Sequence, residues 1–364
     1  MENILSFIST TGSFIVVIGV IIFIHELGHF LAAKLSGVRV EIFSLGFPPK
    51  MFSKTVGETE YQIAWVPLGG FVKMTGMLDE SLDDDFDPED PKAFINKPFI
   101  NRVFIITAGV IMNFILGYLI YLSVILTMGM GSIEGTDLSL VSSGSPAEVA
   151  GIVMGDRIVE IEGTPITKWE ELTGIVRDHP GDSILVKWMR NDSLFSAVIV
   201  PNVVPSINAE TGDRDSVGQL GVLGTIVRKP VDFFDAFKYA GQNVWMDIDR
   251  SITTISWLVT GQAGISDLSG PLGIAKMSGD SARSGFVTFI VFIAFISISI
   301  GFLNILPIPA LDGGHLLFMI IEGIIRRPIP LKVKSIVIWG GLASLLLLMI
   351  TVSYYDVIRV FFGN

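Results

Sequence analysis

The sequence contains no cysteine and only four histidines among 364 residues. Without cysteine the chain forms no disulfide, offers no thiolate nucleophile and holds no cysteine-ligated metal. Charge is also scarce: 17% of the residues are charged, whereas 50% are hydrophobic, and the mean hydropathy is +0.62. A soluble enzyme of this size is less apolar, so the composition predicts a polytopic α-helical membrane protein.

Long apolar runs set the number of membrane spans. A helix needs about 20 apolar residues to cross the hydrocarbon core. Four stretches meet this length, near Ile4–Ala33, Val103–Met128, Phe286–Leu306 and Ile336–Ile358. The first lacks any Lys or Arg before Lys34, so we expect a permanent span and not a removable signal peptide.

The net charge of −11 is unevenly distributed, because eight acidic residues lie in one run, Asp79–Asp90. Such a run is typical of a solvated loop and not of an active site. The overall acidity argues against a nucleic-acid partner.

Basic residues near the spans predict the orientation. They cluster in the loop between the first two spans and in the short loop between the last two: Lys34, Arg39, Lys50, Lys54, Lys97, Arg102, Arg326, Arg327, Lys332 and Lys334. We therefore expect both loops to be cytoplasmic. The long segment Gly129–Gly285 and both termini then lie outside the cytoplasm.

The outside segment contains alternating apolar runs broken by Gly and Pro, with one short helix signal, over Ser142–Val176 and the following residues. This pattern predicts a small β-rich module and resembles a PDZ domain of the permuted bacterial kind. Such domains bind extended peptides at a sheet edge. The alternative is a spacer that only folds.

Two histidines and a glutamate form an H-E-x-x-H pattern at the end of the first span, in His25, Glu26 and His29. Histidines four apart share one face of a helix and can reach the same ion, with Glu26 beside a bound water as general base. Zinc lowers the pKa of such a water to about 7. The alternative is a pair of hydrogen-bonded core histidines, but polar groups inside a bilayer are costly and usually functional.

Zinc hydrolases commonly use three protein ligands, so a third must come from elsewhere. The best source is Asn304–Gly313, where Pro307 and Pro309 should break the third span. Asp312 follows the break and is favoured over His315, although the residues alone leave this choice open. Asp312 could instead cap the helix that starts near Gly313.

The HELGH motif and the segment N-x-x-P-x-P-x-L-D-G together resemble the site-2 protease family of intramembrane zinc metalloproteases. The four-span order and the PDZ-like insert are similar to its bacterial regulator-of-sigma-E protease group. The resemblance implies His25, His29 and Asp312 as zinc ligands and Glu26 as catalytic base.

The resemblance implies further residues around the site. The segment AGVIMNF is similar to the family's G-x-x-x-N signature, with Gly109 and Asn113, although both residues also suit simple helix packing. The segment Trp65–Met74 is similar to a membrane-associated β-hairpin. The expected substrate-contacting residues are Asn304, Pro307, Pro309, Gly69, Gly70, Phe71 and Asn113.

The expected domains are a first membrane half over 1–128, a PDZ-like domain over 129–205, a linker over 206–285 and a second membrane half over 286–364. Better-known relatives carry two PDZ domains, whereas one is evident here. The linker contains Val231–Leu258, whose apolar positions predict an amphipathic surface helix. The segment Leu268–Met277 also matches the family, with no evident chemistry.

The expected substrates, implied by the resemblance, are single-pass proteins of the bacterial cytoplasmic membrane already trimmed by a site-1 protease, such as anti-sigma factors or remnant signal peptides. Water should reach the zinc from the cytoplasmic side. A non-catalytic PDZ scaffold is the alternative, with a structural zinc held by four ligands that include His315. A transporter would need more intramembrane acids than Asp312 and Glu322.

Overall fold

A computed structural model describes residues 2–77, 87, 89–207 and 214–362. Within the acidic run Asp79–Asp90, residues 79–86 and 88 lie outside the described residues. The chain divides into two compact units. Unit 1 comprises residues 1–123, 237–255 and 264–364, and unit 2 comprises residues 124–236 and 256–263.

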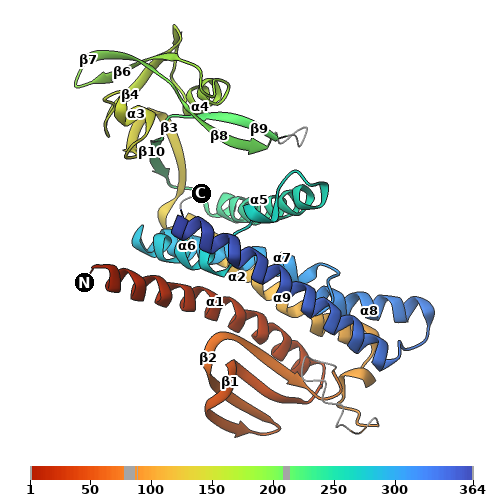
Figure 1. The fold of residues 1–364 in the computed structure, drawn as a ribbon. Helices are drawn as coiled ribbons and strands as arrows, with labels where there is room; N and C mark the ends of the chain where they lie inside the picture. The colour runs from red at the N-terminus through yellow and green to blue at the C-terminus, as the bar shows by residue number, and fades with distance from the viewer. Residues whose placement is uncertain (1, 78–86, 88, 208–213, 363–364) are drawn as a thin grey trace. The chain divides into compact units, whose positions relative to one another are not determined.

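Unit 1 is a helical bundle (Figure 1). Its helices are α1 (Glu2–Leu35), α2 (Phe99–Met128), most of α5 (Phe233–Thr260), α6 (Pro271–Arg283), α7 (Phe286–Ile305), α8 (Asp312–Ile325) and α9 (Leu331–Phe362), with short 3-10 turns η1 (Phe94–Asn96) and η2 (Ile265–Asp267). Within the described chain, four helices are long and apolar enough to cross a membrane: Phe7–Leu35, Phe99–Met128, Phe286–Ile305 and Lys332–Arg359. The predicted polytopic fold with four spans is confirmed.

A β-hairpin follows α1 and contacts its second half (Figure 1). It consists of β1 (Val40–Val56) and β2 (Thr59–Met74), and β1 folds so that residues 42–45 pair with both ends of β2. Several of its large apolar side chains face solvent, Phe52 and Trp65 by 67% and 65%. An apolar exposed face next to a membrane span fits a hairpin that lies against lipid.

Helix α6 contains most of the Leu268–Met277 segment and packs on α1, α7 and α9. Asp356 of α9 is buried, and its Oδ2 accepts a hydrogen bond of 2.8 Å from the Gly273 amide in the first turn of α6. A Cβ on Gly270 would lie 2.8 Å from the same oxygen, so only glycine leaves room for the carboxylate. The Asp356 carboxylate therefore links the last span to α6 by accepting a hydrogen bond at the N-terminus of that helix.

Unit 2 contains a six-stranded sheet in the order β10-β3-β4-β6-β7, with β5 on β4, and a separate β8–β9 pair. The elements are β3 (Met130–Val141), α3 (Pro146–Val149), β4 (Arg157–Ile161), β5 (Thr164–Pro165), α4 (Trp169–Arg177), β6 (Ile184–Arg190), β7 (Ser193–Ile199), β8 (Asn202–Ile207), β9 (Arg214–Gln219) and β10 (Val222–Lys229). Strands β9 and β10 thus lie within the segment 206–285 that was expected to be a linker. Helix α5 covers the predicted amphipathic stretch Val231–Leu258 from Phe233 onward.

In unit 2 the buried carboxylate of Asp156 pairs with the partly exposed Arg190. Asp156 accepts hydrogen bonds of 2.7 Å from both Arg190 Nε and Arg190 Nη2, and one of 2.9 Å from the Val153 amide. Burial alone would raise the pKa of Asp156, but the Arg190 and Val153 hydrogen bonds outweigh it and hold this pKa below its ordinary value of 3.8.

The lowered pKa of Asp156 predicts an acid-sensitive contribution to the stability of unit 2. Because the folded-state pKa lies below the unfolded one, the contribution is present above about pH 4 and is lost as the pH falls through the folded value. Asp156→Asn should destabilise the unit at pH 7 by about 2 kcal/mol. Unfolding of wild type and variant at pH 7 and pH 3 checks this, and a pH-independent difference would contradict it.

Candidate metal centre

Helix α1 presents His25 and His29 on one face, one turn apart, near the end of an uninterrupted apolar span. Both side chains are buried, with 8% and 7% of the residue surface exposed. Their Nε2 atoms are 3.2 Å apart and the rings meet edge to face. Two ring nitrogens this close cannot both carry protons without repulsion, so the pair is suited to share a cation.

The break after α7 carries Asp312 to the same place. Helix α7 ends at Ile305, because Pro307 offers no amide hydrogen and its ring favours the extended conformation observed at Leu306. The chain then turns back so tightly that a Cβ on Gly313 would lie 2.0 Å from the Leu306 carbonyl oxygen. Helix α8 restarts at Asp312, whose side chain does not cap it.

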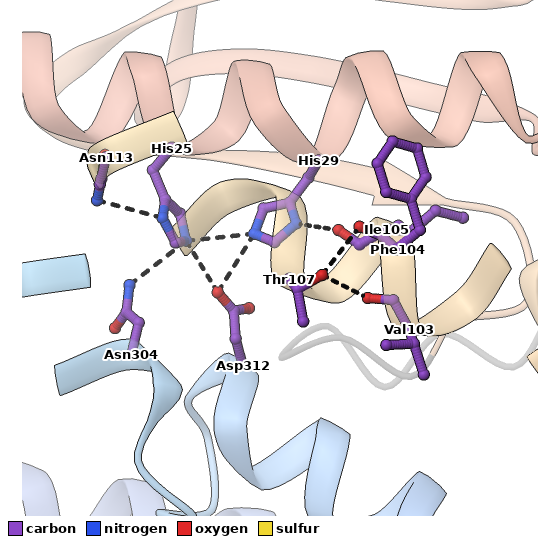
Figure 2. Close-up of polar contacts among 9 residues, drawn as sticks. All are labelled: His25, His29, Val103, Phe104, Ile105, Thr107, Asn113, Asn304 and Asp312. Atoms are coloured by element: carbon purple, nitrogen blue, oxygen red, sulfur yellow. Dashed lines mark hydrogen bonds and ion pairs between the residues drawn. The ribbon is translucent and has the colours of Figure 1, made fainter. Parts of the chain in front are cut away.

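The three side chains converge, as Figure 2 shows. Asp312 Oδ2 lies 3.1 Å from His25 Nε2 and 3.4 Å from His29 Nε2. Ligands of a tetrahedral zinc ion are separated by about 3.3 Å when the bonds are 2.0–2.1 Å long. Asp312 Oδ2 is also buried with no partner of hydrogen-bond geometry. The donor set fits zinc and leaves a fourth position for another ligand.

A hydrogen bond to a backbone carbonyl fixes the tautomer of His29, and Asn113 is the corresponding partner of His25. His29 Nδ1 donates to the Ile105 carbonyl oxygen over 2.8 Å, which leaves its Nε2 lone pair for a metal. His25 Nδ1 lies 3.4 Å from the amide of buried Asn113, whose Oδ1 has no other partner in the described structure. Turning that amide about its axis brings Oδ1 to the His25 Nδ1 hydrogen. Both rings then present Nε2 to the same point.

Helices α1 and α2 approach each other closely at the centre through two glycines. A Cβ on Gly109 of α2 would lie 2.4 Å from His29 Nε2 and 2.8 Å from His25 Cε1. A Cβ on Gly28 of α1 would lie 2.4 Å from the Ala108 carbonyl oxygen. Real side chains do not tolerate such distances, so Gly109 both packs the helices and leaves space for the two imidazoles.

Replacing Gly109 with alanine should therefore displace the histidines. A displacement of about 1 Å at a reacting centre lowers turnover by about 10- to 100-fold. Gly117→Ala is the matched control, because it makes the same change on α2 against Ile298 of α7, away from the histidines. Bound metal and metal-dependent activity of both purified variants test this, and an equal loss in the control would show a general packing effect.

A cavity of about 310 Å³ adjoins the metal centre. Its chemically functional lining consists of His25, Glu26 and Asn304, and the hairpin contributes Gly69 and Gly70. The Asn304 amide nitrogen lies 3.4 Å from His25 Nε2, and a Cβ on Gly70 would lie 3.5 Å from Glu26 Cγ. Glu26, the hairpin and Asn304 thus share one chamber beside the three converging ligand atoms.

Four predicted contact residues do not line this cavity. Phe71 pairs with Ser44 inside the hairpin. Pro307 lies in the break, and Pro309 packs against Gly341 of α9, where an added Cβ would be 2.5 Å away. Asn113 holds His25 from behind. The group of described side chains that converge as metal ligands comprises His25, His29 and Asp312, without His315.

Five residues around the centre were not predicted from the sequence: four that line the cavity and one that positions Asn113. Ile21, Ile22, Phe47 and Ile300 complete the cavity wall, and no signal distinguishes them because apolar residues are the default in a span. Ser297 of α7 is fully buried and donates to the Asn113 carbonyl oxygen over 2.9 Å. A serine within an apolar span often forms an interhelical hydrogen bond, so the sequence could have indicated this contact.

Comparisons with known proteins identify a family and several relatives. Residues 13–348 match the family described as Peptidase family M50. The chain is 31% identical to the zinc metalloprotease RasP of Oceanobacillus iheyensis, over 97% of this chain and 100% of the relative. It is 30% identical to the regulator of sigma-E protease RseP of Escherichia coli, over 98% of this chain and 100% of the relative. The RseP alignment is longer than this chain, so RseP contains residues without a counterpart here.

The strand-rich region is also similar to a solved structure. The PDZ domain of an SdrC-like protein from Listeria innocua is 19% identical and is covered in full by 27% of this chain, with a TM-score of 0.21.

Proposed function

The chain belongs to Peptidase family M50, the site-2 proteases, and from this membership we propose that it cleaves peptide bonds within membrane-spanning segments at the His25–His29–Asp312 centre. It is a membrane zinc metalloprotease. The observation that carries the proposal is the convergence of three ligand atoms beside a cavity that Glu26 also lines.

In the proposed mechanism His25, His29 and Asp312 hold zinc, which supplies Lewis acidity and lowers the pKa of water when it is bound. The Glu26 carboxylate accepts a proton from the attacking water and delivers it to the nitrogen of the broken amide. The products are a carboxylate and an amine. Buried Asn113 and the Ile105 carbonyl keep the two imidazoles oriented through the cycle.

We propose that the substrate enters the cavity as an extended strand. A membrane helix hides its peptide bonds, so the freed backbone groups of an unwound segment need new partners. Gly69 and Gly70 of β2 place backbone without side chains at the cavity, where a substrate strand can pair with it. Asn304 faces them with an amide that can bond the substrate backbone.

The proposed substrates are single-pass proteins trimmed beforehand by a site-1 protease, including anti-sigma factors. We place the centre towards the cytoplasm and unit 2 outside, in a bacterial cytoplasmic membrane, because the basic loops fit a cytoplasmic position. Unit 2 offers a cavity of about 330 Å³ between α4 and the β9–β10 region, beside edge strand β10. An extended peptide can bind there by adding a strand to the sheet edge.

Cleavage of a defined substrate tests the proposal. The purified chain in detergent is given a single-pass substrate, and mass spectrometry locates the cut. We expect cleavage inside the membrane segment, loss of activity after chelation and recovery with zinc. Cleavage outside the segment, or chelator-resistant activity, would contradict the mechanism.

Two variants at the hairpin separate substrate pairing from metal binding. Gly69→Val and Gly70→Val add bulk where Cβ atoms would lie 2.1 Å from the Phe47 ring and 2.7 Å from the Ser44 carbonyl oxygen. Cleavage should slow while zinc content stays at the wild-type level. If cleavage continued unchanged, substrate pairing at this hairpin would be wrong even with the metal site intact.

A further inference from the structure

A second, larger cavity lies in unit 1 and shares no lining residue with the cavity at the metal centre. It has a volume of about 760 Å³ and lies between the start of α2, the second half of α8 and the loop from α8 to α9. Four of its lining residues are cationic, namely Arg102, Arg326, Arg327 and Lys334, and one is acidic, Glu322. The proposed protease mechanism uses none of these five residues.

The charges within this basic cavity do not balance. Lys334 pairs with Glu322 over 2.7 Å, and the same Glu322 oxygen accepts a hydrogen bond of 2.8 Å from the Ile329 amide. In the described part of the chain, no ion pair neutralises Arg102, Arg326 or Arg327, and the buried Nε of Arg102 has no hydrogen-bond partner. A buried guanidinium nitrogen without a partner is costly, so the cavity is suited to an anion that accepts from it.

The position of the basic cavity identifies the kind of anion. It lies where two spans begin, since Phe99 opens the span of α2 and Lys332 opens that of α9. Beside the cations its wall contains apolar side chains, among them Phe99 and Ile95, which are 45% and 46% exposed. A free phosphate needs only the cations, whereas a lipid uses both kinds of surface.

We propose that this basic cavity binds the phosphate of an anionic glycerophospholipid, with its acyl chains along the apolar wall. Arginine suits this ligand because its planar group donates two parallel hydrogen bonds to phosphate oxygens. The lipid would hold the C-terminal end of α8, whose first residue is Asp312. The proposal concerns a separate site and does not depend on the proteolytic mechanism.

Lipid binding by the full chain tests this assignment. The purified protein in a neutral detergent is titrated with phosphatidylglycerol or with phosphatidylcholine of the same acyl chains, and native mass spectrometry counts the bound lipid. We expect a clear preference for phosphatidylglycerol. The double variant Arg326→Gln, Arg327→Gln should weaken that binding about 25-fold, since each lost cation should lower the affinity by roughly a factor of five.

A matched variant guards against a general effect of charge. Lys50→Gln with Lys54→Gln removes the same charge from the exposed hairpin, outside the basic cavity, and should leave the preference intact. The proposal is overturned if this control loses as much affinity, or if both lipids bind equally. It is also overturned if glycerol 3-phosphate binds as tightly as the lipid, since the site would then take a free phosphate ester. Both arginines are exposed, so the double variant should fold.

Discussion

Replacing Glu26 with glutamine should abolish cleavage of a membrane substrate while the purified protein keeps its zinc. Glutamine has nearly the shape of glutamate but cannot accept the proton of an attacking water at neutral pH. Loss of a positioned general base lowers the rate by about 10²- to 10⁴-fold. Single-turnover cleavage and metal content, measured on the same preparation, check both halves of the prediction.

The Glu26 experiment needs a control for the loss of one acidic group. Glu134→Gln makes the same substitution on β3 of unit 2, where Glu134 pairs with Lys229, and should leave the rate unchanged. Cleavage by Glu26→Gln at the wild-type rate would remove Glu26 from the mechanism. A variant that loses zinc as well as activity would assign Glu26 to metal binding.

Replacing Asp312 with alanine should empty the metal centre. The carboxylate is the only oxygen donor in the described ligand cluster, and without it two imidazoles remain. The affinity for zinc should fall by more than the roughly 10- to 100-fold that accompanies loss of an outer-shell partner. Cleavage should fall with it. Metal analysis after dialysis against a weak chelator measures the effect.

The variant His315→Ala is the natural control for Asp312→Ala. His315 lies one turn further along α8 and has the ligand chemistry of a competing donor, but it is not in the converging group. It should retain zinc. Loss of zinc in His315→Ala with retention in Asp312→Ala would exchange the roles of the two residues, whereas loss of zinc in both variants would support the structural-zinc alternative.

The helical part of the centre was predictable from the sequence. An α-helix brings residues four apart onto one face, and an apolar span makes a helix the only acceptable local structure. His25 and His29 therefore had to lie together. Proline chemistry likewise predicted the break before Asp312, and the structure ends α7 at Ile305 for that reason.

Long-range geometry was less accessible. The choice between Asp312 and His315 depends on how the chain folds back after α7. Gly313 and Gly314 make this tight turn possible, because at both positions a Cβ would clash with a nearby carbonyl oxygen. Nothing in the local pattern says which side chain then faces α1. Pro309 packs on Gly341, a contact that only the position of α9 defines, and its expected contact with substrate stays a prediction.

Strand pairing also exceeded what the pattern revealed. Strand β10 pairs with β3, although the whole β-rich module separates them in sequence. A boundary drawn at residue 205 leaves β10 outside the module, since alternation reveals a strand but not its partner. The structural role of the Leu268–Met277 segment could not be predicted either, because it depends on a hydrogen bond to Asp356 in the last span.

The order of the ligands along the chain has a consequence for biosynthesis. The ribosome delivers both imidazoles with the first helix and the carboxylate only with α8, near the end of translation. A nascent chain that has inserted everything up to α7 would hold two of the three proposed zinc ligands, and we expect it to be inactive. Under this assignment hydrolytic activity would arise only when membrane insertion is nearly complete.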